Sequence, residues 1–267
     1  MDRSPATVDL FGLRFDRVDM VGAVAQVMAA AQARMPCLVV TPNIDQIVKF
    51  GADPFMHQVY RSALHIYADG MPLVWISRLL GHQRLPARVT GADLLPAVCC
   101  QAAQTGLSVY FCGGEPGVAE AAARSMRARF DGLVVAGVNS PPYGFEFDEK
   151  QSAQLVDDIN RSGARILFLG VGAPKQEKWA FQHLSHLNVG PILCVGAAFS
   201  FAAGLVRRAP RWVRDCGMEW AWRLGLEPRR LWRRYLVDDM KILALTWREF
   251  QQVKRGLPSA DHTLPPH

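Results

Sequence analysis

The chain has 267 residues, half of them hydrophobic, and carries a net charge of +6 at pH 7. These values exclude a disordered protein and leave enough chain to bury a sizeable core. The sequence contains no apolar run of the roughly 20 residues that a membrane-spanning helix requires. The first residues, MDRSPATVDLFGLRFDRV, also lack the apolar segment of a secretory signal. We therefore expect a cytoplasmic protein.

Cysteine and histidine spacing gives no sign of a metal site or a redox centre. The six cysteines form no C-x-x-C pair and lie mostly within apolar segments. Such cysteines are typical of buried free thiols in a reducing compartment. The seven histidines show no ligand spacing, and His183 and His186 are expected on a helix surface. We expect no metal and no resident cofactor.

From the N-terminus to about residue 200, short apolar runs alternate with amphipathic stretches. VDLFGLRFDRV predicts a strand or hairpin, and the alanine-rich residues 19–34 predict a helix. Further strands are expected within residues 36–43, 64–70 and 107–114 and in the runs LVVAGV, RILFLGVG and ILCVGAAF. Helices are expected at about 43–50, 54–62, 71–81, 91–106, 116–130, 148–162 and 174–186. This order predicts an α/β protein with a Rossmann-like, mostly parallel sheet flanked by helices.

The alternation stops near residue 200, close to where the excess charge begins. Residues 207–234 hold nine arginines, three acidic residues and four of the seven tryptophans, so this stretch alone accounts for the net charge. A basic, tryptophan-rich helix suits an anionic membrane surface or a polyanion, and a solvated helix face is the alternative. We expect a catalytic core over 1–204, a C-terminal helical, Arg/Trp-rich, membrane-associating appendage over 205–255 and a disordered tail over 256–267.

Two glycine-rich turns follow predicted strands. Because ligands bind outside the carboxyl ends of parallel strands, FCGGEPG and LGVGAPKQE are candidate phosphate sites. Neither matches a Walker loop, and a lysine stands where the G-x-G-x-x-G pattern requires its third glycine. The alternative is a tight strand–helix turn that binds nothing. The candidate contacts are Gly113, Gly170, Gly172, Lys175 and Gln176.

Four polar residues occupy other predicted turns. Asp69, in YADG, follows a strand and would reach the ligand crevice as a general base, unless it caps the next helix. Thr41 and Asn43, in TPN, are likewise ligand contacts or helix caps. Arg88, in RVTGAD, would hold a phosphate with two N–H groups, unless it forms only a surface ion pair.

Seven of these stretches together resemble the WecG/TagA/CpsF family of bacterial glycosyltransferases, glycosyltransferase family 26. They occur in the family's order between residues 41 and 235, and they are TPNIDQIV, YADGMPLVW, RVTGADLLP, FCGGEPGVAEAA, FLGVGAPKQEKW, VGAAFSFAAG and RAPRWVRDCGMEWAWRLGLEPRRLWRRYL. The resemblance implies an inverting, metal-independent transfer of a hexose from a UDP-sugar to an undecaprenyl-diphosphate-linked sugar. It also implies a Rossmann-like core with an appendage at the membrane.

The resemblance assigns roles to the polar residues of the core. Asp69 would be the catalytic general base that activates the acceptor hydroxyl, with Thr41 and Asn43 in the same pocket. Arg88 and Gln176 would bind the donor or the acceptor. The UDP-sugar would be a co-substrate rather than a cofactor. The sequence does not choose among N-acetylmannosamine, its uronic acid and glucose as the hexose.

The appendage would bring the enzyme to its lipid-linked acceptor. Its arginines, of which Arg223, Arg230 and Arg233 are the best candidates, would close over the site and meet the diphosphates. The resemblance thus places the protein peripherally on the inner face of the bacterial cytoplasmic membrane. The sequence leaves open whether the chain forms a homo-oligomer.

Two other functions are compatible with parts of the sequence. The alternation of strands and helices also suits a nicotinamide-dependent Rossmann oxidoreductase, although the complete glycine fingerprint and the acidic residue about 20 positions later are missing. The basic stretch alone would suit a non-catalytic protein that binds anionic membranes or nucleic acid. Because no nucleic-acid-binding motif accompanies that stretch, we expect no nucleic-acid partner.

Overall fold

The computed structural model describes residues 7–50, 53–81, 84–206, 208–233 and 238–255. Within these ranges, five side chains lie outside the description: Phe50, Arg211, Asp215, Arg223 and Arg230. The tail predicted for residues 256–267 also lies outside the described residues.

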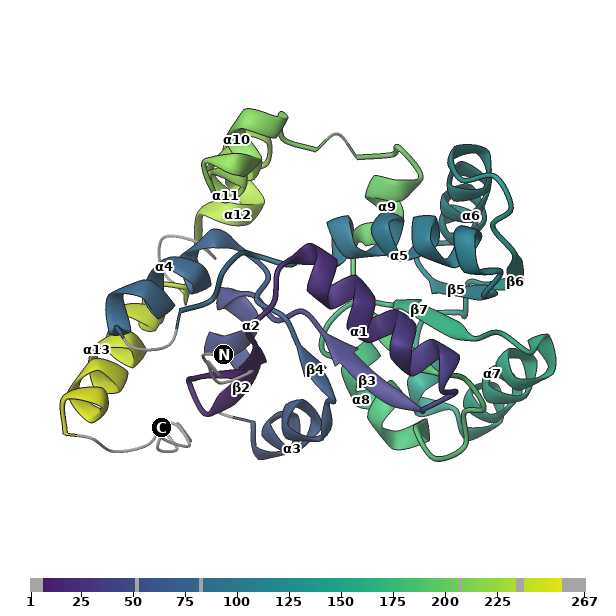
Figure 1. Ribbon diagram of the computed structural model, residues 1–267, viewed down its shortest axis with the longest axis horizontal. Coiled ribbons are helices and arrows are strands. Elements are labelled where there is room, and N and C mark those ends of the chain that lie inside the picture. Colours follow the sequence, from purple (N-terminus) through teal and green to yellow (C-terminus); the bar gives the residue numbers. More distant parts are fainter. Residues whose placement is uncertain (1–6, 51–52, 82–83, 207, 234–237, 256–267) are drawn as a thin grey trace, which may run out of the picture.

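A six-stranded sheet forms the centre of the molecule (Figure 1). Its strands are β3 (Cys37–Val40), β4 (His65–Ile66), β5 (Val109–Gly113), β6 (Val135–Asn139), β7 (Ile166–Gly170) and β8 (Pro191–Cys194). They are ordered β4-β3-β8-β7-β5-β6, and every neighbouring pair is parallel. The Rossmann-like α/β architecture predicted from the sequence is confirmed.

Helices cover both faces of this sheet, because successive strand side chains point to opposite sides. In β7, Ile166 and Phe168 join one apolar cluster, whereas Leu167 and Leu169 join the other. The first cluster contains residues of α1 (Met20–Gln32), α5 (Gly91–Thr105), α6 (Val118–Arg129) and α9 (Ala198–Ala202). The second contains residues of α2 (Ile44–Phe50), α3 (Pro54–Ser62), α4 (Met71–Leu80), α7 (Glu149–Ser162) and α8 (Lys175–His183), and the short 3-10 helix η1 (Phe145–Phe147) adds Phe145.

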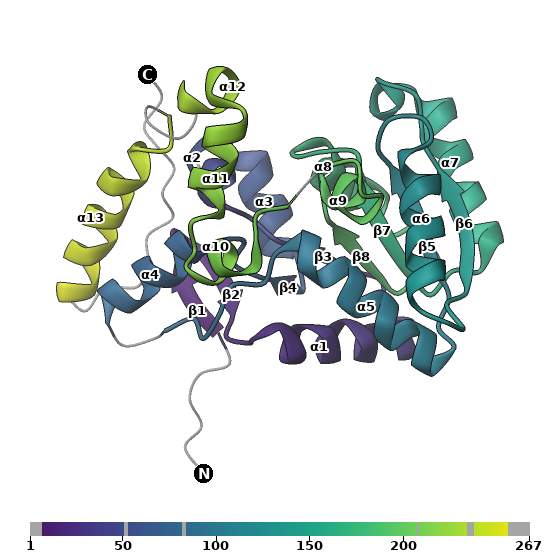
Figure 2. The same ribbon diagram turned by 90° about the horizontal axis from the view of Figure 1, so that it is seen from above.

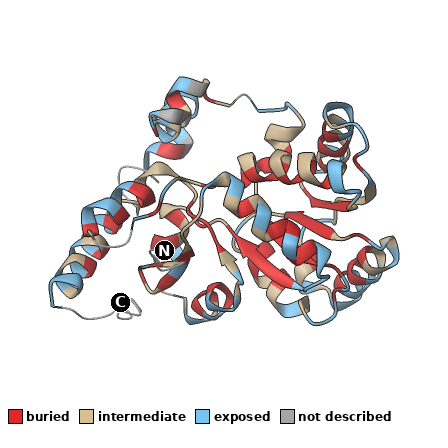
Figure 3. Ribbon diagram, in the orientation of Figure 1, coloured by how far each residue is buried: buried red, intermediate tan, exposed pale blue. Residues whose placement is uncertain are grey.

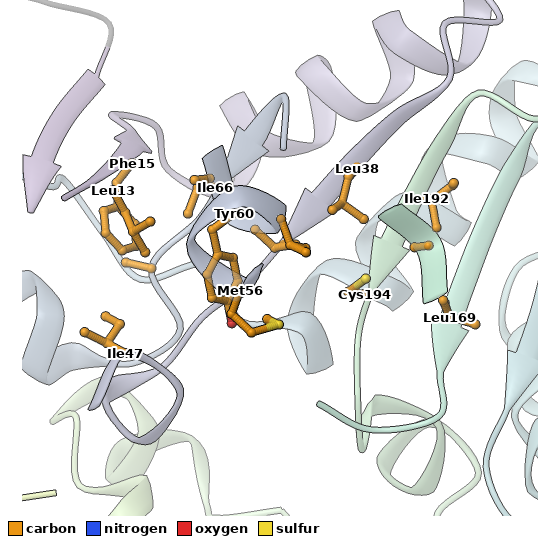
Figure 4. Packing of buried hydrophobic residues seen from close by; sticks show 14 of the residues in the cluster. Leu13, Phe15, Leu38, Ile47, Met56, Tyr60, Ile66, Leu169, Ile192 and Cys194 are labelled. Atoms are coloured by element: carbon orange, nitrogen blue, oxygen red, sulfur yellow. The ribbon is translucent and has the colours of Figure 1, made fainter. Parts of the chain in front are cut away.

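An antiparallel hairpin of β1 (Thr7–Leu10) and β2 (Leu13–Asp16) extends the second cluster beyond edge strand β4. Its side chains Leu13 and Phe15 are buried close to Ile66 (Figure 4). The carboxylate of Asp16 accepts a hydrogen bond from the backbone N–H of Ile66 at 2.9 Å. The hairpin therefore caps the short edge of the sheet and supports the loop that follows β4.

The C-terminal appendage contains α10 (Arg211–Asp215), α11 (Glu219–Leu226), α12 (Pro228–Arg233) and α13 (Lys241–Lys254). Figures 1 and 2 show α10 to α12 grouped beside α4, with α13 running along α4. Gly217, between α10 and α11, is packed so closely on α4 that a Cβ atom there would lie 2.6 Å from the side chain of Met71.

The last helix is part of the main apolar core. Its residues Ile242 and Leu245 are buried in the second cluster, which unites α13 with the hairpin and the sheet. The exposed residues of the appendage lie on the outer sides of its helices (Figure 3). No helix among the described residues is both long enough and apolar enough to cross a membrane.

Candidate active site

Three loops meet at the carboxyl edge of the sheet, where the strand order reverses. After β3 and β4 the chain crosses to β5 on the other side of β8 and β7, and such switch points form ligand crevices. The backbone N–H of Asp69 donates to the carbonyl oxygen of Pro42 at 3.1 Å. The N–H of Val89 donates in turn to the carbonyl oxygen of Ala68 at 2.9 Å. These bonds hold the TPN, YADG and RVTGAD segments side by side.

A cleft of about 320 Å³ opens at these three loops. The core contributes Asn43, Asp69 and Arg88 to its lining. The C-terminal part of the chain supplies the opposite wall, which includes Arg208, Arg214, Glu219, Trp220, Asp239, Met240 and Leu243. The structure thus brings three of the predicted site residues together and encloses them with the appendage.

Asp69 is partly buried and stands at the cleft rather than at a helix cap. The N-cap of α4 is the next residue, Gly70, whose φ of +118° favours glycine and which has no side chain to form a cap. Asp69 therefore does not occupy the N-cap position of α4. Its role as a general base stays a prediction.

Asn43 combines a capping role with its place at the cleft. Its Oδ1 accepts from the N–H of Gln46 at 3.1 Å, and Gln46 Oε1 accepts from the N–H of Asn43 at 2.9 Å. This reciprocal pair fixes the start of α2. Thr41, in the same turn, lies against Gly91 and is not part of the cleft lining.

Five charged side chains join the core to the appendage at one end of the cleft. Arg88 Nη1 lies 3.2 Å from Glu219 Oε2, and Arg208 Nη2 lies 3.4 Å from Glu219 Oε1. Asp93 binds both guanidinium groups of Arg208 and Arg214, with Arg214 Nη1 at 3.3 Å from its Oδ1. Three cations and two acids from α5, the preceding loop and the appendage therefore form one network.

Within this network, Asp93 and Arg208 favour their charged forms despite their burial. Burial opposes the charge on Asp93, but the hydrogen bond and positive charge of Arg208, with Thr90 and Arg88, hold the pKa of its carboxyl below the usual value. Burial also disfavours the Arg208 cation, yet Asp93 and Glu219 raise the pKa of this guanidinium. The charges of Asp93 and Arg208 stabilise each other, and the network adds an ionic contact between the appendage and the core beside the cleft.

A family model for the WecG/TagA/CpsF glycosyl transferases matches residues 8–256. The chain belongs to this family. It is therefore a glycosyltransferase of cell-surface polysaccharide synthesis, a class that uses a sugar donor and a lipid-linked acceptor. The oxidoreductase and non-catalytic alternatives are set aside.

Both predicted glycine-rich turns of this glycosyltransferase lie at the carboxyl edge of the sheet, but neither lines the cleft. Gly113 and Gly170 are partners in the β5–β7 pairing, and a Cβ atom on Gly113 would lie 2.5 Å from the carbonyl carbon of Gly170. A Cβ atom on Gly170 would lie 2.9 Å from the ring of Phe199. Close packing therefore requires glycine at both positions, and a phosphate role for them and for Gly172 stays a prediction.

The polar residues that begin α8 are engaged within the protein. Gln176 is 2% exposed, donates to Glu177 Oε1 at 2.9 Å and accepts from the N–H of Gly196 at 3.1 Å. Lys175 Nζ lies 3.1 Å from Glu146 Oε1 and 3.8 Å from the ring centre of Tyr143. The structure thus places Gln176 and Lys175 outside the cleft that holds Asp69, and their ligand contacts stay predictions.

Glu177 is buried, and among the described residues its Oε2 has no hydrogen-bond partner. Burial raises the pKa of its carboxyl from 4.5 to about 7. The stability contributed by the neutral form is therefore complete below pH 4.5 and is lost as the pH rises through 7. We expect Glu177→Gln to exceed the wild type in free energy of unfolding by up to about 3 kcal/mol at pH 8 and by almost nothing at pH 4.5. Urea unfolding at both pH values tests this, and a difference that does not change with pH would contradict it.

The structure describes the side chain of only one of the three appendage arginines predicted to meet substrate. Arg233 is exposed at the end of α12, while the side chains of Arg223 and Arg230 lie outside the described part of the chain. The appendage arginines that line the cleft, Arg208 and Arg214, were not selected from the sequence. No spacing signal separates them from the seven other arginines of this stretch.

The described residues contain no group of three or more His, Cys, Asp or Glu side chains arranged to hold a metal ion. The positive charge at the cleft is supplied by Arg88, Arg208 and Arg214.

Proposed function

We propose that this chain is an inverting, metal-independent glycosyltransferase that moves a hexose from a UDP-sugar to a polyprenyl-diphosphate-linked sugar. The observation that carries the proposal is the cleft, in which Asp69 shares a lining with Arg88, Arg208 and Arg214. One carboxylate base beside a cluster of cations matches the needs of sugar transfer with a diphosphate leaving group.

In the proposed reaction, Asp69 accepts the proton of the acceptor hydroxyl while that oxygen attacks the anomeric carbon. The bond from this carbon to the UDP oxygen breaks, and the leaving UDP takes the electron pair. Attack from the face opposite the leaving group inverts the anomeric configuration, so a single base is sufficient. Arg88 and its neighbouring arginines would stabilise the charge that develops on the diphosphate.

The appendage would hold the enzyme at the inner face of the cytoplasmic membrane. Its described tryptophans include Trp212, Trp232 and Trp247, all with exposed side chains. Tryptophan side chains partition into the headgroup region, and the basic residues of the same helices would be attracted to anionic lipid. A polyprenyl acceptor stays in the bilayer, so this surface would present the cleft to the diphosphate and its sugar.

A donor screen tests the proposed function. The full chain is incubated with a lipid-diphosphate-linked sugar and, separately, with the UDP forms of N-acetylmannosamine, its uronic acid and glucose. We expect UDP release that requires both substrates, is strongest with one donor and proceeds at the same rate with EDTA. A UDP release that depends on added metal would overturn metal independence, and no transfer from any UDP-sugar would overturn the donor class.

A further inference from the structure

Glu219 bridges two arginines that come from different parts of the chain. Its Oε2 pairs with Arg88 Nη1 at 3.2 Å, and its Oε1 pairs with Arg208 Nη2 at 3.4 Å. Arg88 belongs to the core loop before α5, whereas Glu219 begins α11 of the appendage. All three residues line the cleft that contains Asp69. A carboxylate therefore occupies the position between two guanidinium groups, an arrangement that a phosphate group also adopts.

The two acids of the network are held differently. Asp93 accepts from Thr90 Oγ1 at 2.9 Å and also pairs with Arg208 and Arg214, so it is anchored on α5. Among the side chains that the structure describes, Glu219 pairs with Arg88 and Arg208 alone. Glu219 is therefore the acid that can leave without breaking contacts within the core, while Asp93 keeps Arg208 in place.

Not every N–H group of the arginines in this network has a hydrogen-bond acceptor. Among the described residues, the Nε atoms of Arg208 and Arg214 are buried and have no hydrogen-bond partner. A buried guanidinium N–H without an acceptor is costly. A ligand with more oxygens and more charge than one carboxylate would bind the Nη atoms of Arg88 and Arg208 more strongly than Glu219 does.

We infer that Arg88 and Arg208 form a diphosphate-binding pair, and that Glu219 is its displaceable counter-ion. The inference rests on the proposed function, since both the donor and the acceptor of that reaction carry a diphosphate. In the free enzyme Glu219 neutralises the pair and fastens α11 to the core. When substrate binds, its diphosphate takes the place of the carboxylate. The same exchange disfavours singly charged anions, because these gain little over the carboxylate that they must displace.

Binding of inorganic pyrophosphate to the full chain, measured by calorimetry at low ionic strength, tests the inference. Glu219→Gln removes the competing charge, and we expect it to bind pyrophosphate about five- to tenfold more tightly than the wild type. A residue that only supports the fold would give the opposite result, because its loss would weaken the site. The matched control is Glu227→Gln, which removes the same charge from an exposed position between α11 and α12 and is expected to leave the affinity within twofold.

A second variant decides the matter if Glu219→Gln does not fold. Arg208→Gln is expected to weaken pyrophosphate binding at least tenfold, since it removes one half of the pair. Unchanged or weaker binding by a folded Glu219→Gln, equal gains in both glutamate variants, or unchanged binding by Arg208→Gln would each overturn the inference.

Two further arms identify the source of the diphosphate. UDP and geranyl diphosphate are titrated into the wild type and Glu219→Gln. A gain for UDP alone assigns the pair to the donor, and a gain for geranyl diphosphate alone assigns it to the acceptor. These measurements require no sugar transfer. If the donor screen fails while Glu219→Gln still gains affinity for pyrophosphate, the proposed reaction is wrong and the diphosphate site stands.

Discussion

Replacing Asp69 with asparagine is expected to leave the protein folded and to reduce sugar transfer about a thousandfold. Asparagine preserves the shape of the side chain but cannot accept the proton of the acceptor hydroxyl, and general-base catalysis contributes about 10²–10⁴ in rate. The residue lines the cleft, and the N-cap position of α4 is taken by Gly70, so asparagine at position 69 leaves the N-cap residue of that helix unchanged. Initial rates of UDP release and the thermal unfolding temperature measure the two expectations.

The matched control is Asp45→Asn, which removes another carboxylate from the lining of the same cleft. Asp45 Oδ1 lies 2.7 Å from Lys49 Nζ one turn along α2, so its charge is already paired within the helix. We expect this variant to retain at least a tenth of wild-type turnover. Transfer by Asp69→Asn at a rate near wild type, or an equal loss in both variants, would show that Asp69 is not the base.

The fold could be predicted from the sequence because each strand and helix carries its own local signal. The four-residue apolar run CLVV became β3, and Thr90 caps α5 at the predicted start of that helix. β4 is shorter than the pattern suggested: it contains only His65 and Ile66, and the backbone N–H of Ile66 donates to Asp16 of the hairpin instead of to another strand of the sheet. Such contacts are long-range and leave no periodic trace in the sequence.

The cleft residues that come from the core were predictable, whereas Arg208 and Arg214 of the appendage carry no local signal. Asn43, Asp69 and Arg88 each follow or precede a recognisable element, and parallel strands bring their loops to one edge. Arg208 and Arg214 stand among nine arginines within 28 residues, and only tertiary packing selects which of them face the cleft. The close approach of Gly113 to Gly170 likewise depends on strand order, which local sequence does not specify.

The appendage is expected to lose its hold on anionic membranes when its exposed tryptophans are replaced. Trp212, Trp232 and Trp247 are 69%, 51% and 61% exposed. Burial of one large apolar side chain contributes about 1.5–3 kcal/mol, so the exposure of these three leaves stabilisation that a membrane surface could supply. If each contributes about 1 kcal/mol at the headgroup region, the combined alanine variant binds anionic vesicles about a hundredfold more weakly. Vesicle sedimentation at fixed ionic strength measures this loss.

Substitution in the full chain is the sharper experiment because removal of the appendage would damage the core. Ile242 and Leu245 of α13 are buried in the main apolar cluster. A chain cut at residue 205 would expose that cluster, and the newly exposed apolar surface could itself bind lipid. Phe147→Ala serves as the control, since Phe147 is 86% exposed but lies in η1, outside the appendage, and is expected to change vesicle binding less than twofold. Vesicle affinity that survives the triple substitution would mean that the tryptophans do not hold the enzyme at the bilayer. A loss on neutral vesicles alone would place the remaining attraction on the arginines, because their contribution requires anionic lipid.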